Sequence, residues 1–312
     1  MKSVFIISPF HYCHSVATLV EGLQTKGIKV FSNTNHNYIK QPIQNLDIQL
    51  KVAEKVDVVV LAHSALELKY KNKIDPLINS IKVDVFLDGS DNKEYEANPS
   101  DYKLYLKREY LGTAEPNVHP FIFGIEDRYF VHTNKTHQEI WSNKIDDLVC
   151  IMSACEKRPW RFDIINTLKD IFDRENTVFV GEYREGDTST NIDTGGRHFS
   201  GYFEKLLGSR ISVDAYGAFE ARQTGRFWES IANGCLVMYQ PIEPYKWNNT
   251  FIDEKHFISY TNTDELIDKA SYYVSNPDKA EKIAKRGYQH ALENHRTFHR
   301  ADQFLDLCSG YL

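Results

Sequence analysis

The sequence contains no apolar run close to the roughly 20 residues that a membrane span needs. Its first residues, MKSVFIISPFHY, lack the long apolar core and the small-residue cleavage site of a signal peptide. They are instead typical of a first strand. The net charge of −6 does not mark a nucleic-acid binder, although a local basic face remains compatible with it. We therefore expect a globular chain without a transmembrane segment.

The chain is also poor in patterned cysteine. Its five cysteines show no regular spacing, and we expect free thiols in a reducing cytoplasm. The run His11-Tyr-Cys-His14 looks like a pair of metal ligands, yet no second cysteine or histidine pair at zinc-site spacing completes it. The sequence therefore predicts a cytoplasmic protein without a bound metal.

What the sequence does have is an alternation of strand and helix patterns. Apolar runs such as SVFIIS, IKVFSN, VDVVVLAHSA and VDVFLDGS alternate with helical spacing such as SVATLVEGLQTKG. Near-continuous apolar strands separated by helices indicate a parallel sheet that is covered on both faces. The chain turns polar at residues 131–146, and there we place a domain boundary.

The same pattern then restarts. DDLVCIMSA, NTVFVGEY and RISVDAY are typical of strands, and RFDIINTLKDIF, FSGYFEKLLGS and DELIDKASYYV are typical of helices. A length of 312 residues suits two domains of about 150 residues each. We predict an α/β protein with one domain at residues 1–145, a second at 146–293, and a helical segment at 294–312.

The stretch GRFWESIANGCLVMYQ, which begins at Gly225, follows the predicted strand RISVDAY and its loop. In parallel sheets ligands bind beyond the carboxyl ends of strands, where helices begin. A helix start with a nearby arginine, Arg226, suits a diphosphate, and the carboxylate of Glu229 suits the paired hydroxyls of a ribose. The alternative is that Glu229 caps its helix and Arg226 pairs with it on the surface.

RFWESIANGCLVM, then FIDEKHFISYTNTDELIDKASYYVSNPDKAEKIAKRG, then HRTFHR resembles the C-terminal domain of group 1-like glycosyltransferases. The resemblance implies the GT-B architecture, in which two Rossmann-like domains face a cleft and the terminal helix crosses back to the first domain. It also implies a nucleotide sugar held mainly by the second domain and an acceptor held mainly by the first. Many relatives carry two glutamates separated by seven residues, whereas Glu220 and Glu229 are separated by eight. The resemblance therefore assigns only the ribose role, to Glu229.

Further candidates lie in the loops after other predicted strands. Asp88 and Asp91 follow VDVFL, where a carboxylate can take the proton of an acceptor hydroxyl; Asp-Gly-Ser-Asp is equally favourable turn chemistry. Their rivals for this role are His11 and His14, in the loop after the first strand.

Cationic candidates follow the same logic. Lys107 and Arg108, after the alternating strand KLYLKRE, point toward the donor phosphate or acceptor, or form a solvated charge pair on an edge strand. Arg158 follows the first strand of the second domain, at the start of the next helix, where a phosphate is welcome.

Taken together, these features predict a metal-independent glycosyltransferase. It would move a sugar from a nucleoside-diphosphate sugar, its co-substrate, to an acceptor hydroxyl, without any other cofactor. The acceptor stays open between a glycan, a lipid-linked glycan, a protein and a modified DNA, so nucleic acid enters only as a possible substrate. The alternatives are a nucleotide-sugar epimerase and a protein that binds a nucleotide sugar without turning it over.

Overall fold

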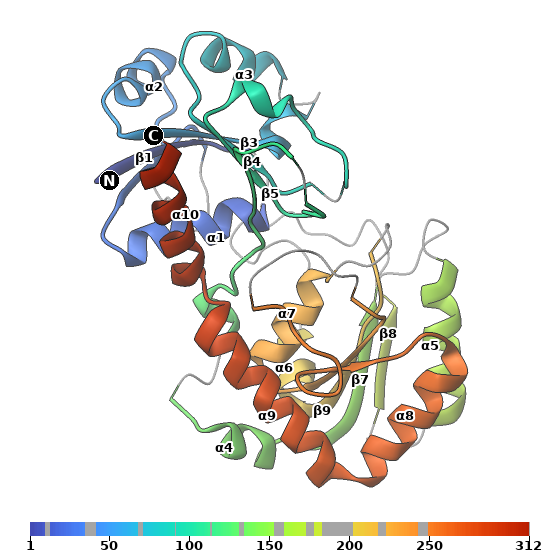
Figure 1. The fold of residues 1–312 in the computed structure, drawn as a ribbon. Coiled ribbons are helices and arrows are strands. Elements are labelled where there is room, and N and C mark those ends of the chain that lie inside the picture. Colours follow the sequence, from blue (N-terminus) through green and yellow to red (C-terminus); the bar gives the residue numbers. More distant parts are fainter. Residues whose placement is uncertain are drawn as a thin grey trace.

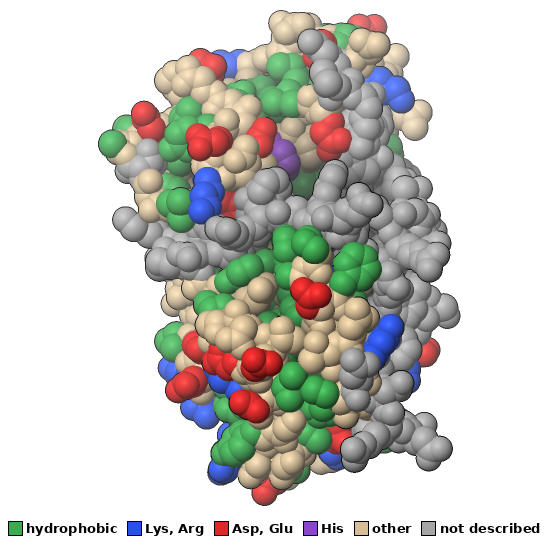
Figure 2. All heavy atoms as spheres, turned by 90° about the vertical axis from the view of Figure 1, so that its right-hand side faces the viewer, with side chains coloured by type: hydrophobic (Ala, Val, Ile, Leu, Met, Phe, Trp, Pro, Cys, Tyr) green, Lys and Arg blue, Asp and Glu red, His purple; other side chains and the backbone are tan. Residues whose placement is uncertain are grey.

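The chain forms two α/β halves, one above the other in Figure 1 and again in Figure 2, and the last helix reaches from the second half to the first. The computed structural model describes residues 1–9, 13–34, 42–67, 71–90, 92–112, 114–130, 134–152, 159–172, 178–182, 202–217, 223–242 and 249–311. Within these residues, no helix combines the length and the apolar character needed to cross a bilayer.

The first half is built on a parallel sheet in which the first strand pairs on both sides. The strand order is β2 (Lys29–Ser32), β1 (Ser3–Ile7), β3 (Val58–Ala62), β4 (Val85–Asp88), β5 (Leu104–Lys107) and β6 (Val118–Pro120). All these strands are parallel, but successive strands are added on one side of β1 and then on the other, so the strand order reverses between β1 and β3. Open α/β sheets bind ligands at such a switch point. Strand β5 lies inside the sheet, so the edge position expected for KLYLKRE is wrong.

Alternate side chains of these strands enter two separate cores. Val4 and Ile6 pack with α1 (His14–Thr25) and with α10 (Thr297–Tyr311), whereas Phe5 and Ile7 pack on the opposite face. That opposite face is covered by α2 (Leu46–Ala53) and α3 (Lys71–Ile78). The period of two along each strand explains why almost every strand residue is apolar in a sheet that is covered on both sides.

The second half repeats the scheme with a five-stranded parallel sheet. Its order is β11 (Ile258–Ser259), β10 (Leu236–Tyr239), β9 (Ser209–Val213), β7 (Asp146–Met152) and β8 (Val178–Glu182). The surrounding helices are α5 (Pro159–Phe172), α6 (Tyr202–Gly208), α7 (Gly225–Ala232), α8 (Thr263–Ser275) and α9 (Pro277–Asn294). The switch point of this sheet lies between β7 and β9.

Two segments connect the halves. Helix α10 follows α9 after a short break and buries Ala301, Phe304 and Cys308 in the core of the first sheet, which confirms the predicted return of the terminal helix. Residues 122–130 leave the first sheet and pack into a core built mainly from the second half. The polar stretch expected at the boundary contains a helix, α4 (His137–Ser142), whose buried face contacts α9.

Candidate functional site

Helix α7 begins next to a buried carboxylate at the carboxyl end of β9. Asp214 follows this strand and is completely buried. Its side chain accepts a hydrogen bond from Arg226 Nη1 at 2.9 Å and another from the hydroxyl of Thr224, the residue before the helix. Arg226 is therefore held by Asp214, a buried partner that comes from the loop after β9. The carboxylate fixes the guanidinium at the start of the helix.

The start of α7 meets the first domain at His14. A Cβ atom added to Gly225 would lie 3.3 Å from His14 Nε2 and 3.5 Å from Glu229 Oε1. Glu229 is the fifth residue of α7 rather than a first-turn residue, but side chains of a helix lean toward its N-terminus, so its carboxylate reaches back to Gly225. The structure thus brings together three predicted site residues from both domains: His14, Gly225 and Glu229.

His14 is supported from the segment that joins the domains. Its Nδ1 lies 3.8 Å from Glu126 Oε1, and Glu126 is only 1 % exposed. Glu126 also forms an ion pair with Arg128 at 2.8 Å, while the His14 ring lies against Phe123 with 5.4 Å between ring centroids. The imidazole is therefore oriented by a buried carboxylate and a phenyl ring, and its Nε2 faces α7.

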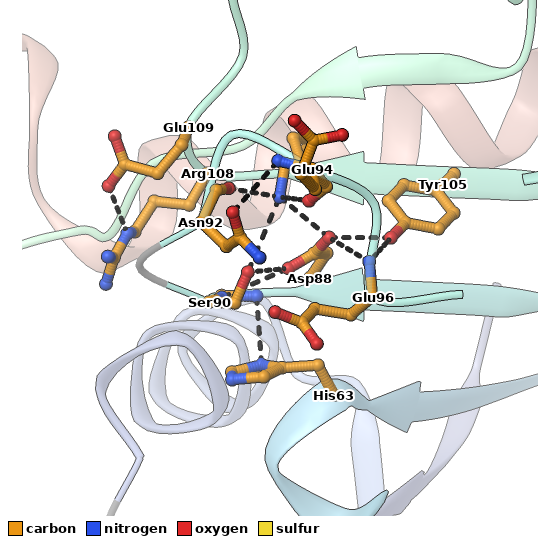
Figure 3. Close-up of polar contacts among 11 residues, drawn as sticks. His63, Asp88, Ser90, Asn92, Glu94, Glu96, Tyr105, Arg108 and Glu109 are labelled. Carbon is orange, nitrogen blue, oxygen red and sulfur yellow. Dashed lines mark hydrogen bonds and ion pairs between the residues drawn. The ribbon is translucent and has the colours of Figure 1, made fainter. Parts of the chain in front are cut away.

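Asp88, predicted as a general base, lies in a closed polar cluster at the end of β4 (Figure 3). It is 0 % exposed, and it accepts hydrogen bonds from Tyr105 at 2.6 Å, from Ser90 at 2.6 Å and from Lys107 at 2.9 Å. Burial alone would raise the pKa of Asp88, but the Lys107 ammonium and these hydrogen bonds outweigh it and hold the pKa below its ordinary value. The geometry gives Asp88 a structural role in place of the predicted catalytic one.

Lys107, predicted to bind the donor, belongs to the same cluster and is 1 % exposed. Besides Asp88, its ammonium donates to the backbone carbonyls of Asn92 at 2.6 Å and Glu94 at 2.7 Å. All the donors of the ammonium are thereby used inside the protein, which argues against a donor-binding role for Lys107. Lys107, paired with Asp88, instead fixes the backbone of the loop that carries Asn92 and Glu94.

Arg108, the next residue, does lie at the edge of the site. Its Nε donates to Glu109 Oε1 at 2.8 Å, and its guanidinium lies 4.9 Å from the centroid of the Phe123 ring, which also contacts His14. Three other predicted site residues, His11, Asp91 and Arg158, lie outside the described residues. Their roles stay predictions.

Two residues near the site were missed or misjudged from the sequence. Arg161, which the sequence does not single out, is 3 % exposed and donates to the carbonyls of Ala215 and Tyr216, just after β9. His63 belongs to the run VDVVVLAHSA that predicts a strand, but β3 ends at Ala62. His63 therefore follows the strand, at the switch point of the first sheet. The signal that could have found it is a histidine directly after a fully apolar strand.

No triad of histidine, cysteine, aspartate or glutamate with metal-binding geometry occurs among the described residues. Independence from metal is therefore still a prediction, which rests on the cations and the helix start at α7.

The C-terminal part of the chain is similar in sequence to a known family. Residues 163–306 match the family described as glycosyl transferase-like. No curated protein is significantly similar in sequence. These residues contain the motif RFWESIANGCLVM, so the resemblance stated from the sequence is confirmed.

Solved structures extend the likeness to the whole chain. An α-glucosyltransferase, solved with UDP-glucose and DNA, superposes with a TM-score of 0.64 at 10% identity over 98% of both chains. A glycosyltransferase from Rickettsia africae gives 0.62 at 12% identity over 99% of this chain and 98% of that one. HepE from Anabaena, solved with UDP, gives 0.57 at 11% identity over 99% and 100%. The predicted arrangement of two Rossmann-like domains, GT-B, is confirmed.

Proposed function

We propose that this protein, which has the GT-B fold, is a glycosyltransferase that moves a sugar from a nucleoside-diphosphate sugar to an acceptor hydroxyl at the junction of its two domains. The observation that carries the proposal is the meeting of His14 with the start of α7. The first domain thereby presents a proton acceptor where the second presents an anion site.

The start of α7 supplies the chemistry for a diphosphate. Backbone N–H groups in the first turn of a helix have no partner within the helix, and the helix dipole favours an anion there. Arg226 is positioned beside them by Asp214, and Gly225 lets a ligand approach the backbone. UDP and UDP-glucose in the similar solved structures support a nucleoside diphosphate as the ligand of this domain. Arg158 remains a candidate for the same phosphates.

Catalysis then rests on alignment and on charge. We assign to His14 the removal of the proton from the acceptor hydroxyl, with Glu126 orienting the ring and stabilising its protonated form. Arg226 and the helix start stabilise the negative charge that develops on the leaving diphosphate. Closure of the two domains around the donor would exclude water and so prevent its hydrolysis.

Four cysteines, Cys13, Cys150, Cys235 and Cys308, are free thiols, and three of them are buried. Free thiols are typical of reducing compartments. We infer a cytoplasmic location from this usage. Reactivity of the purified protein toward a thiol reagent after denaturation without reductant would check it: disulfides formed in cells would contradict the inference.

The first prediction concerns the metal. Because Arg226 and the helix start balance the diphosphate charge, we expect calorimetry to show that a nucleoside diphosphate binds in the presence of a chelator. A panel of UDP, GDP and ADP covers the common bases. Binding that appears only after magnesium or manganese is added would contradict metal independence.

The second prediction concerns Glu229, which is 6% exposed. If its carboxylate accepts hydrogen bonds from both ribose hydroxyls, Glu229→Ala should weaken nucleotide affinity by about 10- to 100-fold, since hydrogen bonds to charged groups are worth about 1.5–3 kcal/mol. The wild-type protein should also lose affinity for a 2′,3′-dideoxy nucleotide, while Glu229→Ala should barely distinguish the two ligands. A variant that discriminates as strongly as the wild type would show that Glu229 does not hold the ribose.

A further inference from the structure

The loop surface at the carboxyl ends of β3, β4 and β5 contains a polar group that the proposed reaction does not yet use. His63 begins a short 3-10 helix directly after β3 and is partly exposed. Its Nδ1 accepts a hydrogen bond from the backbone N–H of Gly89 at 3.1 Å. In a neutral imidazole only one nitrogen carries the proton, so a ring whose Nδ1 is an acceptor must carry its proton on Nε2.

The backbone of Gly89 is held in place, which makes this tautomer a fixed property of the fold. A Cβ at Gly89 would lie 2.1 Å from the Ser15 hydroxyl of α1 and 3.6 Å from His63 Cε1. Gly89, directly after β4, is therefore enclosed between α1 and His63, and its backbone N–H points at the imidazole ring. Burial lowers the pKa of His63; Asp88 opposes this and Arg108 reinforces it, so the pKa lies below its ordinary value and the ring is neutral at pH 7.

A carboxylate faces the same ring from the next loop. Figure 3 shows the Glu96 side chain directed toward His63. The backbone N–H of Glu96 is anchored by Tyr105 at 3.1 Å, inside the cluster of Asp88 and Lys107. A fixed donor and a carboxylate acceptor thus stand side by side, which is the combination that a hydroxyl group requires.

The charge of this surface decides against a polyanionic ligand. Glu94 and Glu96 are exposed, and neither forms an ion pair with any described residue. Two nearby cations are paired, Lys107 with Asp88 and Arg108 with Glu109, and the exposed Lys93 stands alone beside Glu94 rather than in an array of cations. A chain of phosphates would be repelled here, since proteins bind nucleic acids with arrays of Lys and Arg.

We propose that His63 is an acceptor-binding residue, which donates a hydrogen bond from Nε2 to a hydroxyl of a neutral carbohydrate acceptor while Glu96 accepts one from the same molecule. The inference rests on the proposed transferase function and names its acceptor class. It places the acceptor on the first domain, at the β1/β3 switch point.

Two substitutions of His63 separate this role from a structural one. An asparagine can place its side-chain oxygen where Nδ1 accepts from Gly89 but cannot donate at the Nε2 position. A glutamine can place its NH₂ group at the Nε2 position and keep the outward donor. We expect His63→Asn to raise the KM for the acceptor by about 10-fold, and His63→Gln to stay within about threefold of the wild type. UDP affinity should be unchanged in both, as in the control His119→Asn.

The assay uses a UDP-sugar donor, a panel of neutral octyl glycosides as acceptors, and double-stranded DNA as the alternative acceptor. Transfer to a glycoside with the expected order of KM values supports the inference. Transfer to DNA but not to glycosides overturns it, and so does an impaired His63→Gln beside a normal His63→Asn, which marks a purely structural histidine. If the wild type binds UDP and its acceptor KM is unchanged in His63→Asn, only this inference fails; if it binds no nucleoside diphosphate at all, the proposed function fails.

Discussion

Replacing Lys107 with methionine is expected to lower the free energy of unfolding by about 3–5 kcal/mol at pH 7, because it leaves the charge of Asp88 buried without its counter-ion. Both side chains are essentially inaccessible, at 1% and 0% exposure, so solvent does not screen the pair. Methionine has nearly the shape of lysine, and the loss should therefore reflect charge and hydrogen bonding more than packing. Urea unfolding followed by circular dichroism measures the change.

The pH dependence of this loss gives a second and sharper readout. In the wild type the pKa of Asp88 lies below the ordinary value of 3.8, so its stabilising effect is complete above that value and is lost as the pH falls through the lowered pKa. Without Lys107, burial raises the pKa of Asp88 above the unfolded value. The penalty in the variant is then present above the raised pKa and is relieved as the pH falls through it. The stability difference should shrink between pH 7 and about pH 4.

A matched control is Lys103, which directly precedes β5, the strand that ends at Lys107. Lys103 pairs with Asp84 at 2.9 Å, but its side chain is 40% exposed, so Lys103→Met should cost no more than about 1 kcal/mol. A loss for Lys107→Met as small as that of Lys103→Met would contradict the buried-pair interpretation. So would a loss that is constant with pH.

The regular features of the fold could be predicted because they follow from local pattern. Fully apolar strands indicated sheets covered on both faces, and both sheets are parallel and covered. In the stretch GRFWESIANGCLVMYQ a glycine stands where the helix ends: Gly234 follows the capping residue of α7 and adopts a φ of 68°. A left-handed residue after a helix is a local requirement, and glycine meets it at little cost.

The partners of charged residues could not be predicted, because they come from distant parts of the chain. Arg226 and Glu229 are neighbours on one helix, yet Arg226 pairs with Asp214, on the loop after β9. Asp88 and Lys107 are the last residues of two apolar strands, at the carboxyl edge of the sheet where functional residues are common. Adjacent parallel strands place them side by side, in register, and there they neutralise each other. A single sequence does not distinguish a carboxylate that faces a cleft from one enclosed by its neighbour.

The second large effect is expected for His14. If its imidazole takes the proton of the acceptor hydroxyl, His14→Ala should lower kcat by about 10²- to 10⁴-fold, the usual contribution of a general base. Nucleoside-diphosphate affinity should stay within about threefold, because Arg226 and the helix start would still hold the diphosphate. Steady-state kinetics with a UDP-sugar, together with calorimetry of UDP, measure the two quantities on the same preparation.

The pH profile tests the role more directly than the size of the loss. A general base must be unprotonated to act, so wild-type kcat/KM should fall on the acid side as His14 becomes protonated, and the residual activity of His14→Ala should lack this limb. Glu126→Gln should lower kcat less than His14→Ala and shift the limb to lower pH, since it removes the negative charge 3.8 Å from Nδ1. If His14→Ala instead weakens UDP binding by the same factor as it lowers kcat/KM, the imidazole binds the diphosphate and the proton is taken by another group. Because Asp88 is enclosed, that group would have to be sought first at His11 or Asp91.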